Sequence, residues 1–122
     1  MSSLLQDTLP DLADELTALL RSQNGRDLAE QVPLLRLVDR CRCGDDFCAM
    51  LYTAPKPKGA YGPNHESIPL NPSSGHLILD LVDRKIVSIE ILFRDDLRNR
   101  VLQLFPQHSV NKPLSESGGR AQ

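Results

Sequence analysis

The stretch that most constrains the fold is residues 76–93, which read HLILDLVDRKIVSIEILF. In both halves of this stretch, successive side chains alternate between two faces and β-branched residues are frequent, which is typical of β-strands. Polar residues centred on Asp83 and Arg84 separate the two halves and mark a turn. Because apolar side chains point to both faces, we expect a β-hairpin that is covered, at least in part, on both sides.

The turn of this hairpin has an unfavourable sequence. A two-residue type I′ turn places both central residues at positive φ and favours Asn or Asp followed by Gly. Here Asp83 is followed by Arg84 instead. Two alternatives remain open: Arg84 adopts the strained left-handed conformation at a cost of about 1 kcal/mol, or the loop is longer than two residues.

Helices are predicted at three segments, from apolar spacing and from capping and stop signals: residues 8–23, 26–31 and 95–105. Thr8 and Asp95 are the expected N-caps of the first and last helix. We expect the leucine stripe of the first helix to pack on a sheet, with a dimer interface as the alternative.

Further strands are expected outside the main hairpin. Residues 34–42 and 47–54 have strand composition and are joined by turn residues 44–46. The long Pro/Gly-rich stretch at residues 55–74 has room for one more short strand, near residues 67–70. A long loop of this kind is either functional or flexible filler.

These elements predict an α+β fold: an antiparallel β-meander of four to five strands with the N-terminal and C-terminal helices packed on one face. We assign residues 1–106 to a single domain, which is long enough to bury its own core. Residues 107–122 are mostly polar, so a disordered tail is expected there. The protein is expected to be a monomer or a homodimer.

Composition narrows the partners and the compartment. The net charge is -2, whereas nucleic-acid-binding proteins usually carry a basic surplus, so no nucleic-acid partner is expected. The best basic patch, formed by Arg36, Arg40 and Arg42, is interpreted as a solvated strand face. No apolar stretch approaches the roughly 20 residues of a membrane span, and the N-terminus lacks a signal-peptide pattern. We therefore expect no membrane contact and a cytoplasmic protein with reduced thiols.

The run CRCGDDFC, residues 41–48, contains all three cysteines of the chain. On a strand, Cys41 and Cys43 point to the same side, and a four-residue hairpin loop places Cys43 opposite Cys48. Three thiolates and one imidazole form a common tetrahedral zinc site. The sequence therefore predicts zinc ligands at Cys41, Cys43, Cys48 and His65, with His76 as the second choice for the imidazole.

Two other interpretations of the cysteines remain open. The same strand face carries apolar residues such as Leu37 and Tyr52, and cysteine often behaves as a small buried hydrophobe, so the thiols are alternatively part of the core. A redox pair between Cys43 and Cys48 is the third interpretation.

Two stretches resemble known bacterial families. The run ILDLVDRKIVSIEIL resembles the hairpin of small domains of unknown function, with the pattern I-L-D-x-V-D-x-x-I-V-x-I-E-I-L; Arg84 stands where Gly is usual. The run CRCGDDFCAMLYTAP, with the pattern C-x-C-G-D-D-x-C, is similar to a run in uncharacterised proteins of comparable size. The resemblance implies a fold and carries no activity.

Two functions from different classes follow from these observations. The first is a small non-catalytic binding or regulatory protein that contacts a protein partner, for example of the toxin-immunity type, with or without a structural zinc site. The second is a thiol- or metal-dependent enzyme that uses Cys41, Cys43 and Cys48. We favour the first, because the chain is small and acidic, has no recognisable active site and carries a long loop that could contact a partner. A hairpin thiol beside Asp45 and Asp46 also has its pKa raised rather than lowered, which argues against the enzyme. No catalytic residue is assigned.

Overall fold

The computed structural model of the protein describes residues 3–106, so the tail predicted at residues 107–122 lies outside the described residues. The helices are α1 (Leu5–Thr8), α2 (Pro10–Ser22), α3 (Arg26–Ala29), the 3₁₀ helix η1 (Val32–Leu34) and α4 (Asp95–Leu104). The strands are β1 (Ser3–Leu4), β2 (Arg36–Leu37), β3 (Asp39–Arg40), β4 (Leu51–Tyr52), β5 (His65–Pro69), β6 (His76–Val82) and β7 (Lys85–Leu92).

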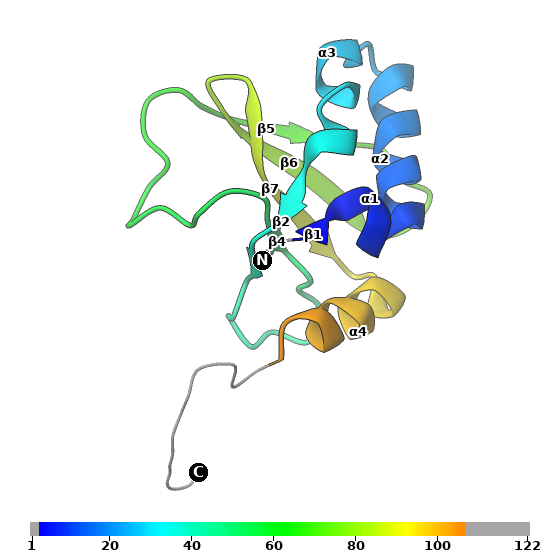
Figure 1. Cartoon of the computed structure of the whole chain (residues 1–122), viewed down its shortest axis with the longest axis vertical. Coiled ribbons are helices and arrows are strands. Elements are labelled where there is room, and N and C mark those ends of the chain that lie inside the picture. The colour runs from blue at the N-terminus through cyan, green and yellow to red at the C-terminus, as the bar shows by residue number, and fades with distance from the viewer. Residues whose placement is uncertain (1–2, 107–122) are drawn as a thin grey trace, which may run out of the picture.

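Five strands form one antiparallel sheet in the order β3-β4-β7-β6-β5, and β1 and β2 form a second, two-stranded sheet. The α+β class is therefore confirmed, and β6 and β7 are the hairpin predicted from residues 76–93. The strand order departs from a simple meander because β4 pairs with β7 rather than with β5. The loop at residues 53–64 swings out beside the sheet and carries the chain from β4 to the edge strand β5 (Figure 1).

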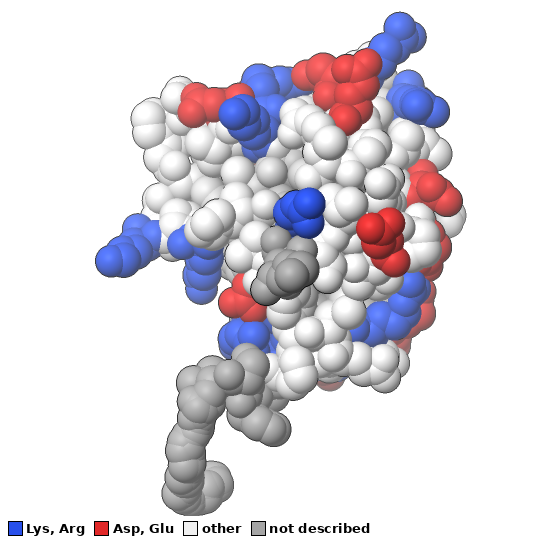
Figure 2. Space-filling view, viewed as in Figure 1, with Lys and Arg blue, Asp and Glu red and all other residues white. Residues whose placement is uncertain are grey.

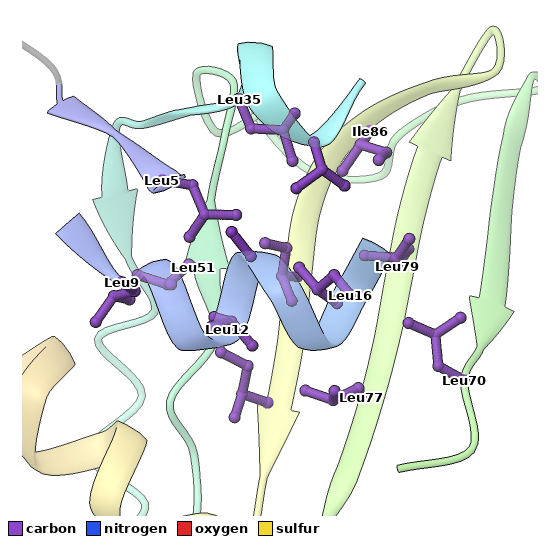
Figure 3. Close-up of a cluster of buried hydrophobic side chains, with 14 of the residues drawn as sticks. Leu5, Leu9, Leu12, Leu16, Leu35, Leu51, Leu70, Leu77, Leu79 and Ile86 are labelled. Atoms are coloured by element: carbon purple, nitrogen blue, oxygen red, sulfur yellow. The ribbon is translucent and has the colours of Figure 1, made fainter. Parts of the chain in front are cut away.

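Helix α2 lies across one face of the main sheet, and α4 lies near one end of it (Figure 1). Leu12 and Leu16 of α2 point into the layer between helix and sheet (Figure 3). Leu12 and Leu16 on the helix and Leu51 and Leu79 on the strands are at most 1% exposed. Each fully buried side chain of this kind contributes about 1.5–3 kcal/mol to the stability of the fold. This layer is therefore the hydrophobic core that holds α2 on the sheet.

The helix predicted at residues 8–23 is interrupted at Leu9, and its long part, α2, begins at Pro10. Thr8 is not an N-cap; its hydroxyl donates to the carbonyl of Leu4 at 2.9 Å. The break falls at Leu9, which has φ -131° and ψ 68° between α1 and α2, because Pro10 disfavours helical geometry in the residue before it. Asp95 likewise lies within the first turn of α4, and Arg94 occupies its N-cap position.

The predicted strand at residues 34–42 is divided. Its first part, β2, pairs with β1, whereas its second part, β3, pairs with β4. Its predicted partner at residues 47–54 contributes only the two residues of β4 to the ladder. Because the chain changes partners after Leu37, neither piece is longer than two residues.

The central hairpin has the tight turn that its sequence disfavours. Val82 pairs with Lys85, and the two residues between them, Asp83 and Arg84, have φ of 53° and 64°. Ion pairs hold Arg84 there, to Asp27 in α3 at 2.9 Å and to a carboxylate of β5 at 3.1 Å. The first alternative, a strained Arg84, is therefore confirmed.

A β-bulge lies just beyond this turn and decides which side chains face outward. Leu81 pairs with Ile86 but Asp80 pairs with Ser88, so Val87 is the extra residue of β7. One extra residue reverses the face to which each later side chain of the strand points. As a result Ser88 lies on the same face as Asp80, opposite the helices.

Candidate metal centre

The three cysteines lie where the β3–β4 hairpin extends past its ladder. The N–H of Cys41 donates to the carbonyl of Met50 at 2.8 Å, which continues the strand register. Extended by two residues, this register places Cys43 opposite Cys48, the arrangement expected from the sequence. Gly44 then turns the chain with φ 84°, a conformation that glycine adopts without steric cost.

The sulfurs of Cys41, Cys43 and Cys48 all lie within 4.8 Å of one another, close enough to hold a metal ion. Zinc–thiolate bonds of 2.3 Å in a tetrahedron separate two sulfurs by roughly 3.8 Å, so small side-chain rotations suffice to bind an ion. Cys41 and Cys48 are half-buried and Cys43 is exposed. The interpretation of these residues as core thiols is therefore wrong, because none of them is buried.

The electrostatics of the cluster favour a metal ligand over a free nucleophile. Burial, together with the neighbouring thiols of Cys43 and Cys41, raises the pKa of Cys48 to about 12. At neutral pH such a thiol is protonated and a poor nucleophile. A cation between the sulfurs favours the thiolate form instead, because a metal displaces the thiol protons when it binds.

A cavity of about 280 Å³ opens beside the sulfurs, and Arg40 and Arg98 line it on the side of α4. Arg40 is only 5% exposed, and its Nε donates to the carbonyl of Phe105 at 2.6 Å. The neighbouring Arg42 donates to the carbonyl of Pro106 at 3.0 Å. The interpretation of these arginines as a solvated strand face is wrong for Arg40, whose buried guanidinium instead holds the end of α4.

The structure brings neither candidate histidine into the cysteine group. His65 begins β5, at the opposite edge of the sheet from β3, and its Nε2 lies 2.9 Å from Oδ1 of Asp80. The ring of His76 instead contacts Phe93, with 5.6 Å between centroids. Within residues 3–106, only the cysteines form a metal-ligand group. His65 as the fourth ligand stays a prediction, and it requires His65 to leave Asp80.

A second cluster, on the outer face of the sheet, was missed by sequence reasoning. The carboxylate of Asp80 is 2% exposed and accepts hydrogen bonds from the hydroxyls of Ser67 at 2.8 Å and Ser88 at 2.9 Å. His65 contacts the same oxygen as Ser67, Oδ1, and the ring of Tyr61 from the long loop stacks on His65 with 4.6 Å between centroids. Asp80 thus ties three strands and the loop together.

Glu90 completes this cluster and shares a proton with Asp80. Burial, together with the hydrogen bond to the Asp80 carboxylate, raises the pKa of Glu90 to about 7. Burial also favours the neutral form of Asp80, but the hydrogen bonds from Glu90, His65 and the two serines outweigh it and lower the Asp80 pKa. Below about pH 7 the proton therefore resides on Glu90, and the negative charge on Asp80.

The raised pKa of Glu90 makes stability depend on pH. Between the unfolded value of 4.5 and the folded value of about 7, the native state binds more protons than the unfolded state, so stability falls as the pH rises through this range. Glu90→Gln keeps an N–H donor toward Asp80 at every pH. We expect this variant to gain stability relative to the wild type between pH 5 and pH 8, measured by urea unfolding.

The matched control for this prediction is Glu66→Gln, which removes an exposed carboxylate that pairs with Arg84. Its stability relative to the wild type should change little over the same range. A constant difference between Glu90→Gln and the wild type from pH 5 to pH 8 would contradict the proton-sharing arrangement.

Charge and hydropathy add little to this picture. In Figure 2, acidic and basic side chains lie mainly around the rim of the visible face, and neither sign forms a continuous patch across it. None of the helices in the described part of the chain is long and apolar enough to span a membrane.

Comparison with known proteins leaves the site to be read from its own geometry. No family model, no curated protein and no solved structure matches the chain.

Proposed function

We propose that the protein binds one zinc ion through Cys41, Cys43 and Cys48, and that it acts as a small non-catalytic binding protein whose β3–β4 connection the metal stabilises. The observation that carries this proposal is the convergence of three sulfurs within 4.8 Å. Soft thiolate ligands in this number favour zinc over hard cations such as Mg²⁺.

The metal site and the partner surface are adjacent in this proposal. Phe47 precedes Cys48, and its ring stacks on Phe93 with 5.2 Å between centroids. Phe93 is 58% exposed and Phe47 39%, and aromatic side chains are enriched at protein–protein interfaces. A metal that fixes residues 41–48 also fixes Phe47, which supports a partner-binding role such as toxin neutralisation.

The alternative, a thiol-dependent enzyme, has less support. A thiol nucleophile requires a base within hydrogen-bond reach, and the candidate base His65 is engaged with Asp80 at 2.9 Å. The raised pKa of Cys48 also opposes thiolate formation.

The experiment that tests the metal site is elemental mass spectrometry of untagged protein purified without chelator. We expect one zinc per chain in the wild type and a loss of most of it in Cys48→Ser, because two thiolates alone bind weakly. His65→Gln tests the fourth ligand. We expect this variant to keep its zinc, because His65 is engaged with Asp80 and β5 lies at the opposite edge of the sheet from β3; loss of zinc would instead make His65 the fourth ligand. Zinc-free wild type, or equal zinc in Cys48→Ser, would contradict the proposal.

The partner role has a separate test. Zinc-loaded wild type is compared with a Phe93→Ser variant in pull-downs from native lysate. A partner recovered in stoichiometric amount with the wild type and lost with the variant is expected. Recovery of none with the wild type would count against a binding function while leaving the metal site intact.

A further inference from the structure

We propose that the cavity beside the cysteines binds a small oxyanion, which Arg98 holds and which supplies the fourth ligand of the metal. This inference rests on the proposed zinc site and goes beyond it, because it makes the centre an open, ligand-exchanging site rather than a closed structural one. The ligand offers the metal an oxygen atom of a carboxylate or a phosphate group.

The coordination of the site motivates this inference. Cys41, Cys43 and Cys48 supply three ligands, and no His, Asp or Glu within residues 3–106 joins their group. Three protein ligands with a free fourth position is the pattern of zinc sites that exchange water or substrate, whereas structural sites are closed by four protein ligands. The sulfurs border a cavity of about 280 Å³, which is large enough for a small anion beside the metal.

Arg98 is the side chain that points to an anion. It projects from α4 and lines the cavity. Its Nε is buried and has no hydrogen-bond partner within the described part of the chain. Buried polar groups are nearly always hydrogen-bonded, so an orphan of this kind calls for an explanation such as a bound ligand. A guanidinium presents a planar fork of N–H donors that matches two oxygens of a carboxylate or phosphate.

Asp45 is the competing ligand within the chain. It also lines the cavity, and its backbone carbonyl accepts from the N–H of Cys48 at 3.4 Å. Its side chain is exposed and lies outside the metal-ligand group. If Asp45 closed the site, no added anion would reach the metal in the wild type, and the Asp45→Asn variant would gain the response.

The experiment uses Co²⁺-loaded protein in a non-coordinating buffer, with acetate and inorganic phosphate as separate titrants. The thiolate-to-cobalt charge-transfer band shows that the site is loaded, and the d–d bands report the fourth ligand. We expect a saturable change in the d–d bands with at least one anion, which identifies the carboxylate or the phosphate as the preferred class. Arg98→Met should weaken this binding about tenfold or more, as expected when a charge-assisted hydrogen bond is lost, at unchanged cobalt stoichiometry.

The matched control is Arg100→Met, on the same helix, whose guanidinium pairs with Asp11 at 2.6 Å and does not line the cavity. It should bind the anion as the wild type does. A loaded site without any response to either anion, a response only in Asp45→Asn, or an equal affinity in Arg98→Met would each overturn the inference while the metal site stands. Absence of the charge-transfer band would overturn the metal site itself, and the inference with it.

Discussion

Asp80→Ala is expected to lower the free energy of unfolding by about 3 kcal/mol, the range found when one member of a buried charged network is removed. Asp80 is 2% exposed and holds four side chains: Ser67, Ser88, His65 and Glu90. Its removal leaves their donors without an acceptor in a covered position, and each such loss costs about 1–3 kcal/mol. For a domain of this size, the expected drop in melting temperature is on the order of 10–20 °C.

Urea unfolding at pH 7 measures this effect, with Asp14→Ala as the control. Asp14 is an exposed residue of α2, and an exposed substitution of this kind changes stability by roughly 0.5 kcal/mol or less. If Asp80→Ala were no more destabilising than Asp14→Ala, the network would have no role in holding β5 and the long loop to the sheet.

The Asp80 cluster also shows why sequence reasoning found one site and missed the other. In a regular hairpin closed at Val82 and Lys85, Ser88 and Glu90 fall on the leucine face, away from Asp80. The bulge at Val87 reverses the strand beyond it. Neither residue type nor spacing marks that extra residue, so the carboxyl pair could be found only in three dimensions.

The cysteine cluster was predictable because its geometry is local. A short turn fixes the register of the strands on either side of it, so Cys43 and Cys48 had to face each other once Gly44 began the turn. The position of His65 could not be predicted in this way, because 16 residues lie between it and Cys48 and no local rule fixes where such a loop ends. The structure carries this loop to the far edge of the sheet, where His65 meets Asp80.

The presence of the helices could be predicted from the sequence, but their exact bounds could not. The leucine spacing of α2 anticipated its buried face, since Leu12, Leu16 and Leu20 are all buried. The break at Leu9 depends on one proline, and its effect on the preceding residue outweighed the favourable capping chemistry of Thr8. The strand at residues 34–42 divided because a segment at the N-terminus, β1, pairs with part of it, and such long-range pairing leaves no mark in the local sequence.

Zinc is expected to raise the melting temperature of the wild type by on the order of 20 °C when the free ion exceeds its dissociation constant a thousandfold. Binding to the native state alone stabilises it by about 4 kcal/mol under that condition, and a domain of this size gains about 4–8 °C per kcal/mol. Thiols of the unfolded chain also bind zinc, which reduces the gain. Addition of a chelator should return the melting temperature to that of the metal-free protein.

This stabilisation should weaken as the pH falls, because the metal competes with protons for the thiols. The pKa of Cys48 is raised to about 12 by burial, so below that value Cys48 releases a proton on binding, and its share of the affinity falls about tenfold for each pH unit lost. Thermal unfolding at pH 6, 7 and 8, with and without zinc, measures the trend. Cys48→Ser should show little shift at any of these pH values; an equal shift in that variant would place the bound zinc somewhere other than between the three cysteines.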